Sequence, residues 1–192
     1  MLGLVAVTGA PAAGKSTLAP QLADALGVRL VSKDLIKEAM VEAVGGGDES
    51  WSRILGHASI DAMLILAGGL ETAVLEMYWR PETVARFKDL GRPIVEVFCS
   101  CPAPVLIARA RQRQAERHEI HRRALSDEWA YRAWKPVFDG PVVEVDTRDV
   151  VDSAAVAGAV RQELPAFVSA AQLGGGEARG RGVIARLASL SN

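Results

Sequence analysis

The sequence predicts an α/β fold in which helices cover both faces of a parallel sheet. Five short apolar segments rich in β-branched residues alternate with longer helical patterns, which is typical of parallel strands joined by helices. The length of 192 residues suits one domain with a substantial core. We expect strands at residues 2–7, 28–31, 70–77, 93–99 and 142–145. We expect helices at residues 15–26, 34–44, 50–67, 81–90, 102–124, 127–135 and 150–164.

A glycine-rich turn follows the first predicted strand and precedes the first predicted helix. Residues 9–17 read GAPAAGKST and match the phosphate-binding loop pattern G-x-x-x-x-G-K-[ST] in full. Glycines let backbone N–H groups turn toward a phosphate, and the helix adds unpaired amides and the positive end of its dipole. A glycine turn between core elements is the alternative explanation, but the order of strand, loop and helix favours nucleotide binding.

The loop therefore predicts a nucleoside triphosphate bound together with Mg²⁺. Lys15 is expected to reach the β- and γ-phosphates as a catalytic residue, and the Ser16 hydroxyl to bind the metal ion. The only asparagine of the chain is Asn192, so the Asn-Lys-x-Asp motif with which GTPases recognise guanine is absent. The predicted nucleotide-binding residues of the loop are Gly9, Ala10, Ala12, Ala13, Gly14, Lys15, Ser16 and Thr17.

Composition and charge exclude several other classes of protein. The formal net charge of −1 gives no general attraction to nucleic acid or to anionic lipid, so we expect neither as a partner. Cys99 and Cys101 form neither a C-x-x-C motif nor a disulfide framework, which favours reduced thiols in a cytoplasmic protein. The apolar N-terminus lacks the basic residues of a signal peptide, and the apolar stretch at 62–70 is too short to span a bilayer.

Three sequence features together resemble the P-loop kinases of the nucleoside-monophosphate-kinase-like group. These are the phosphate-binding loop, Lys33-Asp34-Leu35 after the second predicted strand, and an arginine-rich segment at 109–123. The resemblance is to small-molecule kinases and to zeta-toxin-like and chloramphenicol-phosphotransferase-like members, broadly grouped with AAA-family ATPases. It implies a five-stranded parallel sheet of order 2-3-1-4-5 and a helical lid, here at about 109–126. It also implies transfer of the γ-phosphoryl group of ATP to a small-molecule acceptor.

Two carboxylates are expected at the carboxyl ends of the strands, where such sheets bind ligands. By the resemblance, Asp34 is the catalytic residue that orients the attacking hydroxyl and accepts its proton. The alternative role for Asp34 is an N-cap of the following helix. Glu76 ends the third predicted strand and is a candidate for holding Mg²⁺ or substrate, with a solvent-facing position as the alternative. Tyr78 and Trp79 either line an acceptor pocket or pack in the core.

The arginine-rich segment supplies candidates for binding phosphate. Arg109, Arg113 and Arg117 repeat every four residues and share one helix face, from which lid arginines of similar kinases neutralise charge on the transferring group. We predict Arg113 and Arg117 as catalytic and Arg109 as nucleotide-binding, against the alternative of a solvated helix. By the same resemblance, Thr147 and Arg148, after the last predicted strand, are expected beside the adenine. His118 and His121 have the spacing of a metal pair, but no further ligand completes a site.

The domain is expected to span residues 1–168, followed by a flexible, glycine-rich basic tail at 169–192. The leading functional hypothesis is an ATP- and Mg²⁺-dependent kinase acting on a small-molecule hydroxyl; the sequence gives no basis for an oligomeric state. One alternative is a nucleoside or nucleotide kinase, although few basic residues are available for a monophosphate: Lys33, Lys37, Arg53 and Arg80. We interpret Lys33 as solvated and His57 with Asp61 as a surface pair. The other alternative is a regulatory ATP-binding module whose basic tail docks a partner.

Overall fold

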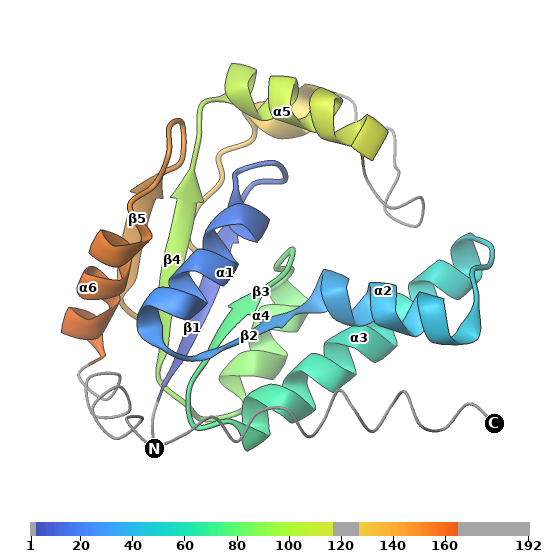
Figure 1. The fold of residues 1–192 in the computed structure, drawn as a ribbon, viewed down its shortest axis with the longest axis horizontal. Coiled ribbons are helices and arrows are strands. Elements are labelled where there is room, and N and C mark those ends of the chain that lie inside the picture. Colours follow the sequence, from blue (N-terminus) through green and yellow to red (C-terminus); the bar gives the residue numbers. More distant parts are fainter. Residues whose placement is uncertain (1–2, 117–126, 165–192) are drawn as a thin grey trace.

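The computed structural model describes residues 3–116 and 127–164, and a five-stranded parallel sheet forms its centre (Figure 1). The strand order is β2-β3-β1-β4-β5, and every neighbouring pair is parallel, which confirms the predicted fold class and order. The strands are β1 Leu4–Gly9, β2 Arg29–Ser32, β3 Ala73–Glu76, β4 Ile94–Ser100 and β5 Val142–Asp146. Because all five run the same way, their carboxyl ends and the loops that follow them meet at one edge of the sheet.

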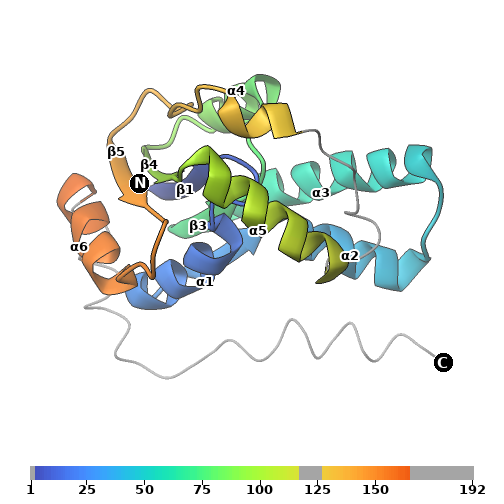
Figure 2. The ribbon, with the colours of Figure 1, turned by 90° about the horizontal axis from the view of Figure 1, so that it is seen from above.

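Helices cover both faces of the sheet, as the sequence predicts. On one face, α1 and α6 pack against β1, β4 and β5 around a core that contains Leu22 and Val160. On the other face, α3 and α4 bury Met63 and Phe87. Seen from above, α5 crosses the carboxyl edge of the sheet (Figure 2). The helices are α1 Lys15–Leu26, α2 Lys33–Val44, α3 Glu49–Gly69, α4 Pro81–Lys88, α5 Ala103–Glu116 and α6 Ser153–Glu163, with a 3₁₀ helix η2 at Asp127–Tyr131.

Two predicted elements are wrong in extent. The α-helix expected at 127–135 is only η2, because Pro136 disfavours a helical conformation at the residue before it and has no N–H to donate. The strand expected at 70–77 is only β3, because α3 continues to Gly69. Arg92 donates to the carbonyls of Ala67 and Leu70 at the end of this helix.

Several residues for which the sequence makes predictions lie outside the described part of the chain. These are Arg117, His118, His121 and the tail at 169–192. Within 3–116 and 127–164, no helix combines the length and the hydropathy needed to cross a membrane.

Cys99 is a buried free thiol, and burial raises its pKa to about 12.

Glu96 is a fully buried carboxylate in the middle of β4 and holds a connecting segment against the sheet. It accepts hydrogen bonds from the backbone N–H of Val137, at 3.0 and 2.9 Å, and of Phe138, at 2.8 Å. The Thr8 hydroxyl of β1 is a further donor. Phe138 in turn packs edge-to-face on Trp79, with ring centroids 5.1 Å apart. The carboxylate therefore links the segment after η2 to the two central strands.

Glu96→Gln is expected to lower the free energy of unfolding by about 2–3 kcal/mol. The amide group of glutamine is itself a donor, so at least one buried N–H or O–H loses its acceptor. Urea unfolding followed by circular dichroism measures this loss. Glu144→Gln on the exposed side of β5 is the matched control, expected to change stability by less than about 0.5 kcal/mol. Equal stabilities of the two variants would show that Glu96 has no such role.

Candidate active site

The loop between β1 and α1 has the backbone conformation that a phosphate-binding loop requires. Gly9, Ala12 and Gly14 have positive φ angles of 124°, 61° and 83°. A Cβ atom on Gly9 would lie 2.3 Å from the carbonyl oxygen of Cys99 on β4, so only glycine fits there. Gly14 is the N-cap of α1, and its left-handed conformation directs the chain into the helix. The unpaired amides of the helix N-terminus are therefore next to the loop.

Lys15 is held inside this loop. Its Nζ donates to the carbonyl oxygens of Gly9 and Ala10, at 3.0 and 2.6 Å, and the residue is only 7% exposed. The ammonium group is thus fixed beside the backbone amides that would surround a phosphate.

Charges on three other elements act on Lys15. Burial lowers the pKa of Lys15, and the negative charges of Glu76 and Asp34 work against that shift. The positive charge of Arg113 lowers the pKa further. The two predicted carboxylates and one predicted lid arginine are therefore within electrostatic reach of the same ammonium group.

Glu76 lies at the end of β3 and is 4% exposed, so the alternative of a solvent-facing carboxylate does not hold. Its Oε1 accepts a hydrogen bond of 3.0 Å from Ser16 Oγ in α1. Its Oε2 accepts one of 2.7 Å from Ser32 Oγ at the end of β2. Two hydroxyls from neighbouring elements thus fix the carboxylate beside the start of α1.

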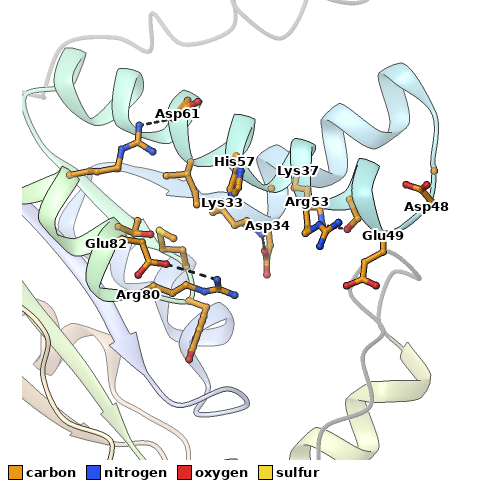
Figure 3. Close-up of a pocket in the computed structure, with 18 residues that line it drawn as sticks. Lys33, Asp34, Lys37, Asp48, Glu49, Arg53, His57, Asp61, Arg80 and Glu82 are labelled. Atoms are coloured by element: carbon orange, nitrogen blue, oxygen red, sulfur yellow. Dashed lines mark hydrogen bonds and ion pairs between the residues drawn. The ribbon is translucent and has the colours of Figure 1, made fainter.

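Asp34 lies in the first turn of α2 rather than at its cap. The helix begins at Lys33 and its N-cap is Ser32, so the N-cap alternative for Asp34 does not hold. The Asp34 carboxylate forms an ion pair of 2.9 Å with Lys33 and its side chain is 45% exposed. The Lys33 side chain is only 17% exposed, so its interpretation as a solvated residue is wrong. In Figure 3, Asp34 points into open space between α2 and the loop after β3.

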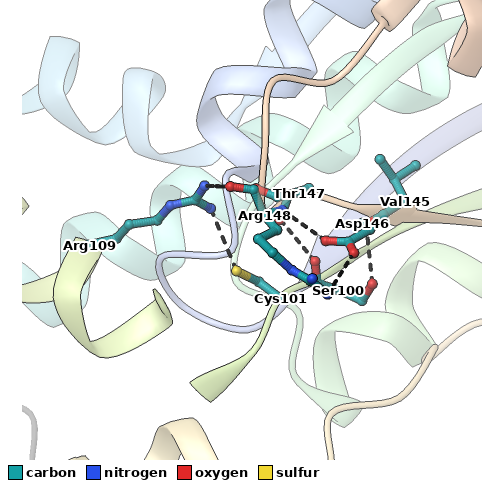
Figure 4. A network of polar contacts seen from close by, with 7 residues as sticks. All are labelled: Ser100, Cys101, Arg109, Val145, Asp146, Thr147 and Arg148. Atoms are coloured by element: carbon teal, nitrogen blue, oxygen red, sulfur yellow. Dashed lines mark hydrogen bonds and ion pairs between the residues drawn. The ribbon is translucent and has the colours of Figure 1, made fainter. Parts of the chain in front are cut away.

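The arginines of α5 contact the phosphate-binding region at two different places. Arg113 donates to Thr17 Oγ1 over 3.2 Å, which places its guanidinium group over the start of α1. Arg109 donates to the backbone carbonyls of Thr147 and Arg148, at 2.8 and 2.9 Å (Figure 4). Arg111 lies on the exposed side, in an ion pair of 2.6 Å with Asp127, as the solvated-helix alternative describes.

Thr147 is a residue of the site whose side-chain role the sequence did not reveal. It is 4% exposed, and its hydroxyl lies 2.9 Å from the carbonyl oxygen of Ala13 and 3.0 Å from that of Ser100. The loop after β5 is thereby fastened to the phosphate-binding loop. The next residue, Arg148, forms an ion pair of 3.2 Å with Asp146, so its predicted contact with adenine stays a prediction. A threonine hydroxyl on a loop carries no sequence pattern that marks this contact.

A cavity of about 1240 Å³ opens beside Asp34, between α2, α3 and the segment from β3 into α4 (Figure 3). Tyr78 lies on its wall, as expected for a residue that lines an acceptor pocket. Trp79 is 8% exposed and packs in the core, which is the other role considered for this pair. His57 and Asp61 also line the cavity; both are exposed, and Asp61 pairs with Arg86 rather than with His57. The volume slightly exceeds the range of about 300–1,000 Å³ that is typical of small-molecule sites.

A sequence profile of the AAA domain family matches residues 4–136, which is more than half of the chain. The chain belongs to the AAA domain family. Among solved structures, a candidate kinase from Chloroflexus aurantiacus shares 30% identity and superposes with a TM-score of 0.77, covering 85% of this chain and 98% of that one. A search of curated proteins finds no match.

Two further solved structures share the fold at lower identity. A Mycobacterium tuberculosis APS kinase in complex with AMPPNP and APS is 15% identical, with a TM-score of 0.55 and coverage of 88% of this chain and 98% of that one. A gluconokinase from Sinorhizobium meliloti is 18% identical, with a TM-score of 0.51 and coverage of 89% and 94%. The predicted resemblance to P-loop kinases of the nucleoside-monophosphate-kinase-like group is confirmed, and it supports a nucleotide-binding phosphotransferase.

Proposed function

We propose that this protein transfers the γ-phosphoryl group of ATP to a hydroxyl group of a small molecule. One observation carries the proposal: Asp34 lies on the wall of the cavity, and its charge acts on the Lys15 ammonium inside the phosphate-binding loop. A candidate base and a candidate phosphate ligand are thus close together, with room beside them for an acceptor. The kinase fold of the similar structures agrees with this assignment.

In the proposed reaction, Lys15 and the loop amides hold the β- and γ-phosphates. The acceptor hydroxyl lies beside Asp34, whose carboxylate orients it and receives its proton. The new O–P bond to the acceptor forms as the bond between the γ-phosphorus and the β–γ bridging oxygen breaks, and ADP leaves. Arg113, held above Thr17, is placed to stabilise negative charge on the transferring group.

The residues at the start of α1 fit a Mg²⁺ ion. Magnesium prefers oxygen ligands and keeps several waters, using one or two protein groups together with substrate phosphates. Ser16 offers a hydroxyl oxygen as a direct ligand, and Glu76, 3.0 Å from that hydroxyl, is placed to accept from a metal-bound water. No cluster of three or more His, Cys, Asp or Glu able to hold a metal occurs among residues 3–116 and 127–164. When bound, the ion supplies charge neutralisation on the phosphates.

Glu76→Gln is expected to raise the Mg²⁺ concentration needed for half-maximal activity by roughly 10- to 100-fold. Glutamine preserves the size of the side chain but removes the negative charge near the Ser16 hydroxyl. Activity is titrated with Mg²⁺ at saturating ATP, with Glu42→Gln on the exposed face of α2 as the matched control. A Mg²⁺ dependence identical to that of the control would show that Glu76 takes no part in binding the metal.

The proposal is tested by a panel of hydroxylated metabolites and antibiotics, scored by ADP release above the rate with water alone. A positive compound must also gain the mass of one phosphoryl group, which distinguishes transfer from ATP hydrolysis. We expect at least one acceptor whose product carries the phosphate on oxygen and whose formation depends on Asp34. Hydrolysis without any phosphorylated product across the panel would contradict a kinase and favour a regulatory ATP-binding module.

A further inference from the structure

The cavity beside Asp34 gathers basic side chains that lie far apart in the sequence. Lys33 and Lys37 come from α2, Arg53 comes from α3, and Arg80 comes from the segment that leads into α4. They are the four residues that the sequence offers for an anionic acceptor, and all four line one cavity (Figure 3). The structure therefore concentrates them where the proposed acceptor binds.

Several carboxylates on the same wall already have partners. Asp61 forms an ion pair of 2.6 Å with Arg86, which also lines the cavity. Glu82 lies 4.0 Å from Arg80. These acidic groups balance the basic groups next to them, and Asp34 balances Lys33. Glu49 also lines the cavity, but neither Lys37 nor Arg53 forms an ion pair within 4.0 Å in the part of the chain that the structure describes.

Asp48, also on the cavity wall, is engaged as the N-cap of α3. Its Oδ1 accepts from Ser50 Oγ at 2.7 Å and from the backbone N–H of Trp51 at 2.9 Å. These bonds lower the pKa of Asp48, with the Ser50 hydroxyl first, and the charge of Arg53 is the smallest contribution. Asp48 is thus engaged mainly as the cap of α3.

Lys37 is the buried member of the group. The residue is 6% exposed, and its Nζ donates to Ser52 Oγ of α3 over 2.7 Å. No carboxylate within 4.0 Å of this nitrogen is found in the part of the chain that the structure describes. Burial lowers the pKa of Lys37, Lys33 lowers it further, and the Asp34 charge opposes both. An ammonium group has three donors, so Lys37 can bind a ligand oxygen while it keeps its bond to Ser52.

Arg53 and His57 extend this basic surface along α3. They are four residues apart on one helix, so they share a face, and both line the cavity. In Figure 3 both side chains lie near Lys37, on the same side of the cavity as Asp34. A buried ammonium group, a guanidinium group and an imidazole thus surround one part of the cavity wall.

Building on the proposed function, we propose that the acceptor carries an oxyanion, a carboxylate or a phosphate, in addition to its reactive hydroxyl. Lys37 and Arg53 bind this oxyanion, with His57 as a further donor, and so place the hydroxyl beside Asp34. An oxyanion supplies the direct ion-pair partner that Lys37 lacks among the described residues, and the guanidinium group of Arg53 matches its paired oxygens. A neutral acceptor would shield this ammonium group from water without supplying a charge, which costs binding energy.

Binding of probe molecules tests the proposal without requiring turnover. D-gluconate is compared with D-glucitol, and glycerol 3-phosphate with glycerol, so that each anion has a neutral partner of similar shape. Each is titrated calorimetrically at millimolar concentrations into protein saturated with Mg²⁺ and AMP-PNP, so that the phosphate-binding loop is occupied. We expect at least one anion to bind more tightly than its neutral partner, and the better anion identifies the acceptor as a carboxylate or a phosphate.

Variants locate the binding. Lys37→Met and, on the exposed side of the cavity, Arg53→Gln should each weaken anion binding by roughly 10- to 100-fold. Both should bind AMP-PNP as the wild type does. Lys135→Met, an exposed lysine away from the cavity, is the matched control. Once an acceptor is known, Lys37→Met should raise its KM far more than it lowers kcat.

Two outcomes overturn the inference: no preference for either anion over its neutral partner, or a preference that neither Lys37→Met nor Arg53→Gln reduces. Failure of the proposed function looks different, because either AMP-PNP itself would not bind or ATP would be hydrolysed without any phosphorylated product. In that case the anions are titrated without nucleotide into Lys15→Met, in which the phosphate-binding loop has lost its ammonium group. Anion binding that still depends on Lys37 there would support the oxyanion site independently of the kinase assignment.

Discussion

Asp34→Asn is expected to lower kcat for phosphoryl transfer by about 10²- to 10⁴-fold, the range typical of losing a general base. Asparagine has the same shape and can still accept a hydrogen bond from Lys33, but it cannot take a proton from the acceptor hydroxyl. Nucleotide affinity should change little, because Asp34 acts on the loop only through its charge on Lys15. Steady-state kinetics at saturating ATP and acceptor measures the effect.

Asp24→Asn, on the exposed side of α1, is the matched control for this variant. Because Ser32 and not Asp34 caps α2, the stability lost in Asp34→Asn should stay below about 1 kcal/mol, from the missing charge at the helix N-terminus. A variant that keeps its stability and turns over at the wild-type rate would refute the assignment of Asp34 as the base.

Lys15→Met should lower kcat by roughly 10²- to 10³-fold, the range found when one preorganised donor to a developing charge is removed. Methionine fills the same space without the ammonium group. Two carbonyl oxygens, of Gly9 and Ala10, also lose their donor, so the loop should bind nucleotide more weakly. Single-turnover transfer and AMP-PNP affinity separate the two effects, with Lys135→Met as the control. Wild-type kcat in Lys15→Met would show that this ammonium group does not act on the transferring phosphate.

The sequence predicted local features of the site better than long-range ones. The phosphate-binding loop, β1 and α1 were predictable because their residues are contiguous and glycine is required at fixed positions, such as Gly9 against Cys99. The burial of Glu76 between two hydroxyls was not, because Ser16 and Ser32 come from different elements. The contact between Thr147 and Ala13 joins residues from opposite ends of the domain and has no local pattern.

The two elements that were predicted with wrong bounds failed for a common reason. Periodicity in a short segment does not show which partner takes its backbone hydrogen bonds. The helix expected at 127–135 is cut short before Pro136, and beyond it the backbone N–H groups of Val137 and Phe138 donate to the buried Glu96. The residues of the cavity wall could not be predicted for the same reason. The sequence around His57 does not indicate which face of α3 lies toward α2 and the loop after β3.

Binding of ATP tests the account most directly, because every assigned role depends on a nucleotide in the loop at residues 9–17. Calorimetric titration with AMP-PNP in the presence of Mg²⁺ should give one site per chain, with affinity reduced by removal of Mg²⁺ and by Lys15→Met. Absence of binding at millimolar nucleotide, in a protein shown to be folded by circular dichroism, would contradict the assignment of this site to phosphoryl transfer.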